Sequence, residues 1–180
     1  MHGIIFQELR RYATARMGEQ GWDTLLQQAA LSRSSYLAFK SYPDEEAVAL
    51  VTAASRMSGK PARAILEDFG EFIAPNLLRG YKALIQPHWS VLDVVEHTER
   101  IHERVRNDPL ATPPNLVCRR LDAGTILVTY VSKRRLCGVG IGFIRGIGRE
   151  LKQPVEVRER QCMHLGAPSC EFEVRRLLST

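Results

Sequence analysis

The sequence lacks any apolar run that approaches the roughly 20 residues needed to span a bilayer. The N-terminus, MHGIIFQELRR, carries its charges only after a short apolar patch and has no small-residue cleavage site, so we expect no signal peptide. These absences predict a cytoplasmic protein that makes no membrane contact and keeps its thiols reduced. In that setting, the four cysteines favour metal binding or core packing over disulfide bonds.

The motifs of common enzyme classes are also missing. There is no pair of carboxylates in a plausible context, no nucleophile elbow and no phosphate-binding loop, so we expect no enzymatic activity. A CxxCH motif is absent, which excludes a c-type haem. The net charge of +5 is modest and favours a solvated basic surface or an anionic ligand over nucleic acid.

The residues that are present fit one globular domain. The 180 residues are 44% hydrophobic and 25% charged, and such a chain can build a core large enough to enclose a cofactor. Helical periodicity dominates about the first 110 residues. Two β-branched hairpins follow, at 115–132 and 154–176, with an apolar, glycine-rich helix at 136–151 between them. The sequence therefore predicts an α+β fold, in which a helical half precedes a smaller antiparallel sheet with packed helices.

Several helix ends have clear signals. Asp44 follows Pro43 and is a good N-cap for a helix that Gly59 ends. Pro61 opens the next helix, and Pro75 is expected to end it. Ser90 is expected to cap the helix over 90–105, which has the most regular apolar face of the chain.

One histidine lies on that apolar face. At about 100° per residue, the face includes Val91, Val94, Val95 and Ile101, and His102 falls well inside it. A neutral imidazole there can bond a backbone carbonyl through one nitrogen and a haem iron through the other. The alternative is a histidine that serves only as a satisfied member of the core.

A tyrosine, a serine and an arginine alternate in YVSKR. If 130–134 is a strand, Tyr130, Ser132 and Arg134 project to one side, because side chains alternate along a strand. An arginine fork beside two hydroxyls suits one or two carboxylates or a phosphate. The alternative is a polar sheet face with an ordinary surface arginine. Together, a lone imidazole in an apolar wall and a separate set of anion donors suit a ligand such as haem b, which is apolar with acidic edges.

Cysteines gather around the last hairpin. Cys162 and Cys170 flank His164, and Cys137 lies in the preceding helix. Three cysteines and a histidine can hold a tetrahedral Zn²⁺, although the spacing is not that of paired CxxC motifs. Reduced cysteines that only pack, or a redox switch, are the alternatives. Cys118 is expected to be a packing residue.

In their order along the chain, these motifs resemble the H-NOX family of haem-nitric oxide/oxygen binding domains. The resemblance rests on IH at 101–102, ATPP at 111–114 and YVSKR at 130–134, supported by MHGII, YPDEE and FGEF, and it covers nearly the whole chain. It implies a single stand-alone domain, 1–180, in which haem lies between a distal helical subdomain, 1–60, and a proximal α+β subdomain, 61–180.

The resemblance also implies roles for individual residues. His102 matches the proximal iron ligand. Tyr130, Ser132 and Arg134 match the clamp on the haem propionates. Pro114 matches the proline that distorts the haem, and Ile5 an apolar residue on the distal side. Some bacterial relatives carry a structural zinc near the last hairpin; if their histidine precedes the first cysteine of that hairpin, Glu159 takes its position here.

One departure bears on the gas that is bound. Oxygen-binding relatives have a distal tyrosine about nine residues beyond the motif tyrosine, where this chain has Val139. Bound dioxygen needs a hydrogen-bond donor and NO needs none, so the resemblance implies a sensor of NO, which also binds CO and excludes O₂. Tyr42 and Tyr81 are left open as other donors.

The resemblance further implies an output. NO would weaken the bond between iron and His102, release the helix that carries it and shift the two halves against each other. In bacterial relatives the partner that reads this change is typically a histidine kinase or a cyclic-di-GMP enzyme.

A second resemblance leads to a competing hypothesis. The pattern C-x-H-x-G-x-x-x-C-x-F from Cys162 to Phe172 is similar to the C-terminal part of small-ligand domains of the vinyl-reductase type. It implies a zinc-stabilised module that binds a different small acid without haem. Haem uptake by the purified protein distinguishes the two hypotheses.

Overall fold

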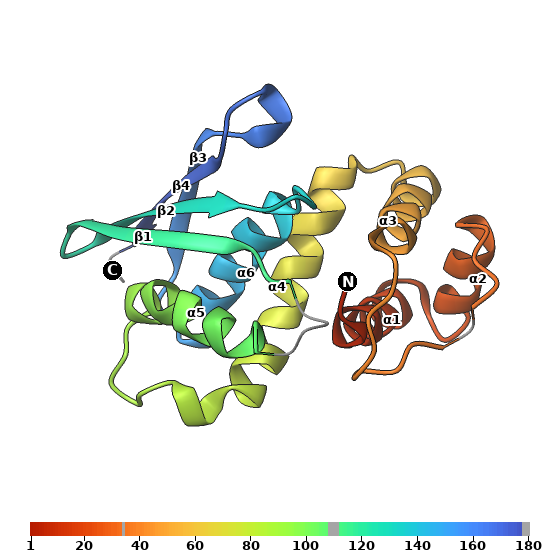
Figure 1. Ribbon diagram of the computed structural model, residues 1–180, viewed down its shortest axis with the longest axis horizontal. Helices are drawn as coiled ribbons and strands as arrows, with labels where there is room; N and C mark the ends of the chain where they lie inside the picture. Colours follow the sequence, from red (N-terminus) through yellow and green to blue (C-terminus); the bar gives the residue numbers. More distant parts are fainter. Residues whose placement is uncertain (34, 108–111, 178–180) are drawn as a thin grey trace.

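The computed structural model of the protein describes residues 1–33, 35–107 and 112–177 (Figure 1). Its helices are α1 (Gly3–Met17), α2 (Gly21–Gln28), α3 (Asp44–Ser58), α4 (Ala62–Gly80), α5 (Val91–Val105) and α6 (Cys137–Glu150). Two short 3₁₀ helices are η1 (Lys82–Leu84) and η2 (Met163–Leu165). The strands are β1 (Asn115–Asp122), β2 (Thr125–Val131), β3 (Val155–Gln161) and β4 (Cys170–Arg176). This order confirms the predicted α+β fold.

The four strands form one antiparallel sheet in the order β1-β2-β4-β3. Alternation sets its two faces: Ile126, Val128 and Tyr130 of β2 are buried, and their β4 partners Val174 and Phe172 are buried on the same face. Helix α5 packs on this face against β1, β2 and β4, and α6 contacts β3. The opposite face of β3 and β4 carries charged residues.

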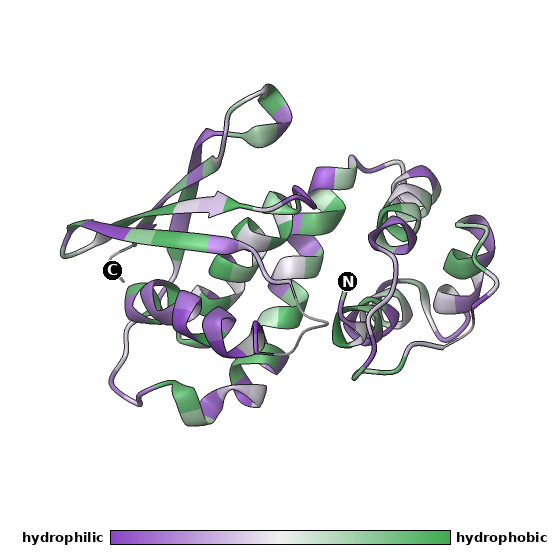
Figure 2. Ribbon diagram, in the orientation of Figure 1, coloured by the Kyte–Doolittle hydropathy of each residue, from purple (hydrophilic) through white to green (hydrophobic). Residues whose placement is uncertain are grey.

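Two hydrophobic cores result from this arrangement. The first joins α1, α2 and α3 to one side of α4, and the second joins α5 and α6 to the inner face of the sheet. In Figure 1 the first three helices lie on one side of the molecule, the sheet lies on the other, and α4 runs between them. Figure 2 shows that hydrophobic residues dominate α6, whereas the visible face of α5 is hydrophilic. Phe143 of α6 packs against both cores.

Helices α4 and α6 approach each other unusually closely, because glycines face the contact. A Cβ on Gly142 would lie 1.9 Å from the carbonyl oxygen of Glu67, and a Cβ on Gly70 would lie 2.2 Å from that of Val139. Only glycine permits such backbone contact. The expected helix at 136–151 therefore packs most closely on α4, rather than on the sheet.

Two of the expected helix ends are wrong. Pro75 lies inside α4 instead of ending it. Ile73 and Ala74 are buried just before the proline, and Leu77 packs against the first core just after it. These contacts hold the helix despite the lost backbone hydrogen bond. By contrast, the Ser90 cap is confirmed, and Asp93 completes a capping box with it.

The second error concerns Asp44, which is the first residue of α3 and not its N-cap. Pro43 takes the cap position, and its side chain makes no capping hydrogen bond. The Asp44 carboxylate instead pairs with Arg134 and with the N-terminal ammonium group. Within the described residues, no helix is long and apolar enough to cross a membrane.

Candidate functional site

A cavity of about 490 Å³ is lined by residues of both cores. Most of the lining is apolar, and it includes the rings of Phe69, Phe143 and Phe172. The polar side chains in the lining are His2, Tyr81, Thr98, His102, Arg104, Thr112, Tyr130, Ser132 and Arg134. A cavity of this size and lining suits a largely apolar ligand with a few polar groups.

His102 lines this cavity from α5, and 21% of its side chain is exposed. Burial lowers the pKa of the imidazole below its usual 6.5, although the Glu99 carboxylate, 3.7 Å from Nδ1, acts in the opposite direction. Nδ1 is buried and has no hydrogen-bond partner within the described ranges. His102 is therefore neutral at pH 7, as a metal-ligating imidazole must be.

The other histidine of the lining, His2, has a structural task. Its Nδ1 accepts a hydrogen bond of 3.5 Å from the amide of Ile4, and so caps α1. His102 is thus the better candidate for a ligand of a bound cofactor.

Tyr130, Ser132 and Arg134 all line the cavity, as expected, but not as one strand. Strand β2 ends at Val131, and the chain then turns, with the Arg135 amide donating to the Ser132 carbonyl oxygen at 3.1 Å. The assumed strand through Arg134 is therefore wrong, although all three residues still line the cavity. Burial raises the pKa of Tyr130 to about 12, so its hydroxyl remains a neutral donor at pH 7.

Arg134 is held by groups from two other parts of the chain. Its Nε donates to Asp44 Oδ1 at 2.8 Å, and its two terminal nitrogens donate to the carbonyl and hydroxyl oxygens of Thr112. The N-terminal ammonium group of Met1 lies 2.7 Å from the same Asp44 oxygen. The guanidinium group therefore joins the helical half, through α3, to the turn after β2.

Asp44 and Thr112 were not recognised as site residues from the sequence. Both fall inside segments that resemble the family, YPDEE and ATPP, but Asp44 was interpreted as a cap. Its partner Arg134 is 90 positions away, and no local pattern encodes such a pairing.

The expected apolar contacts also line the cavity. Ile5 comes from α1, Val139 from α6, and Pro114 from the segment that enters β1. The carbonyl oxygen of Pro114 accepts a hydrogen bond of 3.0 Å from Arg106, which follows α5. Ala111, the first residue of the ATPP motif, lies outside the described residues.

The two tyrosines left open as gas-binding donors differ in position. The Tyr42 hydroxyl accepts a hydrogen bond of 2.7 Å from the Leu37 amide and does not line the cavity. Tyr81, just after α4, does line it. Only Tyr81 of this pair can contact a ligand in the cavity.

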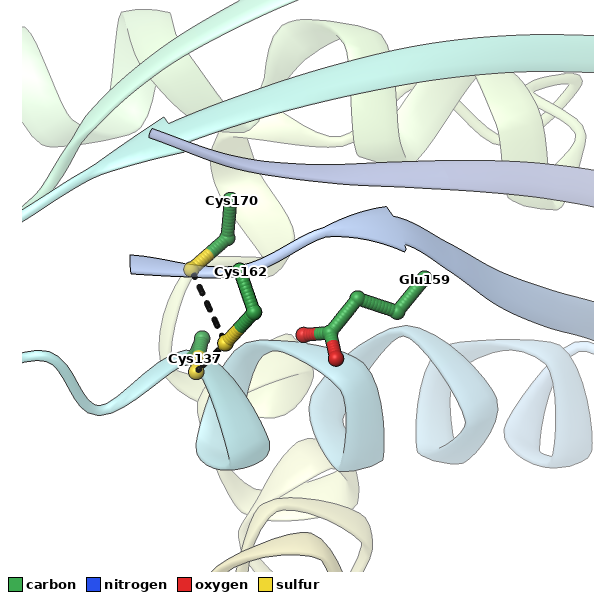
Figure 3. A group of neighbouring side chains, drawn as sticks. All are labelled: Cys137, Glu159, Cys162 and Cys170. Carbon is green, nitrogen blue, oxygen red and sulfur yellow. Dashed lines mark hydrogen bonds between the residues drawn. The ribbon is translucent and has the colours of Figure 1, made fainter. Parts of the chain in front are cut away.

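A second candidate site lies where α6 meets the β3–β4 hairpin (Figure 3). Ligand atoms of Cys137, Glu159, Cys162 and Cys170 all lie within 4.8 Å of one another. The Cys162 sulfur is 3.8 Å from that of Cys137 and 3.7 Å from that of Cys170. Figure 3 shows the Glu159 carboxylate pointing toward the three thiols.

His164, the fourth ligand expected from the sequence, is not in this group. Its Nε2 lies 2.8 Å from the carbonyl oxygen of Arg135, and the residue is exposed. The reason is the 3₁₀ turn η2, in which Met163 takes the buried position and His164 faces outward. Glu159, which was weighed as the alternative, takes the fourth place.

Glu159 had a signal in the sequence. Val155, Val157 and Glu159 alternate with exposed charged residues along β3, so the carboxylate is placed on the inner face of the sheet. Its Oε1 is buried without a hydrogen-bond partner in the described part of the chain. A buried, unpaired carboxylate oxygen beside three thiols fits a bound cation of the zinc type. Cys118 lies apart from this group, with its sulfur 3.6 Å from the Val95 carbonyl oxygen.

The fold and the two sites define a class of protein, an α+β domain with a large, mostly apolar cavity into which the imidazole of His102 faces. The family model described as Haem-NO-binding matches residues 2–159. The chain therefore belongs to the haem-NO-binding family, the H-NOX domains, which are haem-binding gas sensors rather than catalysts.

Solved structures share the fold. An H-NOX protein from S. oneidensis in the Fe(II)NO state is 25% identical, with a TM-score of 0.91 over 99% of this chain and 100% of that one. An unliganded Fe(II) H-NOX protein from K. algicida is 20% identical, with a TM-score of 0.88 over 99% and 98% of the two chains. A mutant H-NOX from T. tengcongensis is 17% identical, with a TM-score of 0.87 over the whole of both chains.

Proposed function

We propose that this protein is a sensor of nitric oxide that uses ferrous haem b, binds NO and CO, and does not bind O₂. The observation that carries the proposal is the cavity, in which the neutral imidazole of His102, whose buried Nδ1 has no hydrogen-bond partner among the described residues, faces a lining of mostly apolar side chains. Haem supplies an iron with an open coordination position for a diatomic gas. Haem b is favoured over haem c because the chain has no CxxCH motif.

Each residue of the lining has a distinct task in this proposal. His102 holds the iron through its imidazole. Tyr130, Ser132 and Arg134 bind the haem carboxylates, with two neutral donors and one cation that suits a carboxylate. Arg134 is already charge-paired with Asp44, so it serves as a bridge between the cofactor and the helical half. Pro114 and Ile5 contact the cofactor as apolar walls.

The selectivity for NO over O₂ rests on the absence of a hydrogen-bond donor in the Val139 side chain. An isopropyl group offers no hydrogen to a bound gas, and NO and CO need none. The similar H-NOX protein from S. oneidensis has been solved with NO and with CO on Fe(II), which supports the same ligands here. Of the two tyrosines considered as donors to a bound gas, Tyr81 is the one in the lining, and replacing it with phenylalanine is expected to leave the gas preference unchanged.

We propose that the signal is a displacement between the distal helical subdomain, 1–60, and the proximal α+β subdomain, 61–180. Helix α5 is tied to β1 by Arg120, which pairs with Asp93 at 2.5 Å and with Glu96 at 2.9 Å. If His102 loses its bond to the cofactor, α5 therefore moves with the sheet, relative to α1, α2 and α3. A signalling partner that prefers one arrangement reads the change, and we expect a histidine kinase or a cyclic-di-GMP enzyme in this role.

The second site is proposed as a structural zinc centre with Cys137, Glu159, Cys162 and Cys170 as ligands. Four ligands from one helix and one hairpin would fix the hairpin against α6 and match the tetrahedral preference of Zn²⁺. His164 is not a ligand in this proposal, because its Nε2 lies 2.8 Å from the carbonyl oxygen of Arg135.

The ultraviolet-visible spectrum of reduced, haem-loaded protein tests the sensor function. We expect a Soret band that shifts on addition of NO and stays unchanged in air. Replacement of His102 by glycine should abolish the resting spectrum, and added imidazole should restore it. A protein that does not take up haem would overturn the proposal and favour the haem-free module of vinyl-reductase type.

A further inference from the structure

Glu159 contacts two different chemical environments at once. Its Oε2 accepts a hydrogen bond of 2.7 Å from Arg63 Nη1, while its Oε1 is buried and has no partner in the described residues. A carboxylate oxygen of Glu159 lies within 4.8 Å of the sulfurs of the three cysteines. Only 16% of the Glu159 side chain is exposed. The carboxylate is thus held from one side by a cation and left open on the other.

Arg63 is in the first turn of α4, almost a hundred positions before Glu159 in the sequence. Its Nε also bonds Glu67 Oε1 at 2.9 Å, and Glu67 Oε2 bonds Arg145 of α6 at 2.7 Å. A continuous chain of alternating charges therefore joins β3, α4 and α6. Because Glu67 fixes the guanidinium from a second direction, Arg63 cannot turn away from Glu159 without breaking another ion pair.

Three thiolates and a carboxylate carry more negative charge than a divalent ion neutralises. A cation beside the carboxylate offsets part of this excess and lowers the cost of burying it. A partner that bonds one carboxylate oxygen also orients the other, as outer-shell groups do in metal sites generally. Arg63 satisfies both requirements, because it bonds Oε2 of Glu159 and leaves the buried Oε1 without a partner in the described residues.

We propose that Arg63 is the positioning residue of the metal centre: it holds Oε2 of Glu159, presents Oε1 to the metal as a single-oxygen ligand, and ties the centre to helix α4. This inference rests on the proposed zinc centre. It assigns to Arg63 a role in metal binding, although Arg63 itself offers the metal no ligand atom.

The tie to α4 has a consequence for the haem cavity. Leu66 and Phe69, one and two turns after Arg63, line the cavity from α4, and Val139 lines it from α6 shortly after Cys137. An occupied metal centre therefore fixes the near ends of both helices that form this wall. Metal removal should make this wall less rigid in the wild type. Loss of Arg63 should remove most of this dependence of the wall on the metal.

The test uses the full-length, haem-loaded protein, from which bound metal is removed with a chelator before titration with Co²⁺ and Zn²⁺. The variants are Arg63→Gln, Arg63→Lys and Arg145→Gln. The last is the matched control, because Arg145 pairs with Glu67 but not with Glu159. The readouts are the Co²⁺ ligand-field and thiolate charge-transfer bands, the Zn²⁺ affinity from chelator competition, and the Soret position with and without metal.

We expect Arg63→Gln to weaken Zn²⁺ binding by about 10- to 100-fold, the usual effect of losing an outer-shell partner, and to change the Co²⁺ ligand-field bands while the thiolate bands remain. Arg63→Lys should recover part of the affinity, because lysine restores the charge but not the planar fork. Arg145→Gln should behave as the wild type.

Two outcomes contradict the inference in distinguishable ways. If Co²⁺ gives thiolate bands in the wild type but Arg63→Gln matches Arg145→Gln in affinity and spectrum, the role of Arg63 is wrong and the zinc centre stands. If the wild type gives no thiolate bands and binds neither ion, the zinc centre itself is wrong, and the inference fails with it.

Discussion

At the scale of single residues, the gas preference of the cavity depends on a hydrogen-bond donor that one side chain lacks. Val139 is the clearest case, because it lines the cavity at the position where oxygen-binding relatives are expected to have a tyrosine. Its substitution by tyrosine adds one hydroxyl to a wall that has none at this point. We expect Val139→Tyr to form an oxygen complex in air that the wild type does not form, measured as a Soret shift of the reduced protein.

The matched control for this prediction is Val139→Phe, which adds the same ring without the hydroxyl. Phenylalanine should leave the spectrum in air unchanged. An oxygen complex in both variants would show that ring size and not hydrogen bonding governs the selectivity, and the interpretation of Val139 would then be wrong.

Asp44 allows a prediction about pH. Burial alone would raise the pKa of this carboxyl, but hydrogen bonds from the N-terminal ammonium group and Arg134 outweigh it and lower the pKa below the usual 3.8. The unfolded chain therefore takes up a proton on Asp44 at a higher pH than the folded chain does. The stability that Asp44 contributes is complete above about pH 3.8 and is lost as the pH falls through the lower folded value.

Urea unfolding of haem-free wild type and Asp44→Asn measures this contribution. The wild type should be the more stable at pH 6, and the gap between the two should close as the pH is lowered toward 3. Glu45→Gln, which removes the neighbouring exposed carboxylate of α3, should show no such closing gap. A gap that is constant with pH would mean that the ion pairs of Asp44 add nothing to stability.

The residues of the site were predictable to different degrees. His102 could be predicted because helical spacing places it on an apolar face. Tyr130, Ser132 and Arg134 could also be predicted as lining residues, although the strand assumed for them ends at Val131. The roles of Asp44 and of Glu159 depend on partners about 90 or more positions away. Residue spacing along one strand or helix cannot specify such contacts. The sequence therefore favoured His164 as a ligand only because it lies between two cysteines in the chain.

At the scale of elements, the α4–α6 contact is the most demanding feature of the fold. The glycines of α6 at 138, 142 and 146 are one helical turn apart, and each faces α4. The sequence predicted a glycine-rich helix. It did not predict which element packs on the glycines, because a row of glycines can pack against a helix or a sheet. The helix through Pro75 was missed for a related reason, since burial on both sides of the proline overrides its helix-breaking tendency.

Gly142→Ala tests this close packing. The new Cβ would meet the Glu67 backbone at 1.9 Å, so the two helices must separate, at a cost typical of overpacking, about 1–3 kcal/mol. Gly80→Ala is the control, because a Cβ at Gly80, the last residue of α4, meets nothing within 4 Å. We expect thermal unfolding at a clearly lower temperature for Gly142→Ala and little change for Gly80→Ala; equal behaviour of the two would contradict the packing argument.

At the scale of the whole molecule, the cavity is built from both cores. Its lining includes Leu9 and Phe69 of the first core and Val94 and Ile144 of the second. Apart from the contacts of α4, the Arg134–Asp44 ion pair is a direct polar tie between the helical half and the sheet. A cofactor in the cavity would add contacts to both cores at once, so the haem and the relative position of the two halves should be thermodynamically coupled.

This coupling predicts how haem affects stability. Because the cavity exists only in the folded chain, a ligand that fills it stabilises the fold by mass action, by about 2.7 kcal/mol when free ligand is 100 times its dissociation constant. We expect the melting temperature, measured by circular dichroism, to rise with haem concentration. His102→Gln, which removes the imidazole but leaves Tyr130, Ser132 and Arg134, should show a smaller rise. An equal rise in the variant would mean that haem is held by its carboxylates and apolar faces alone, and that α5 carries no signal from the iron to the sheet.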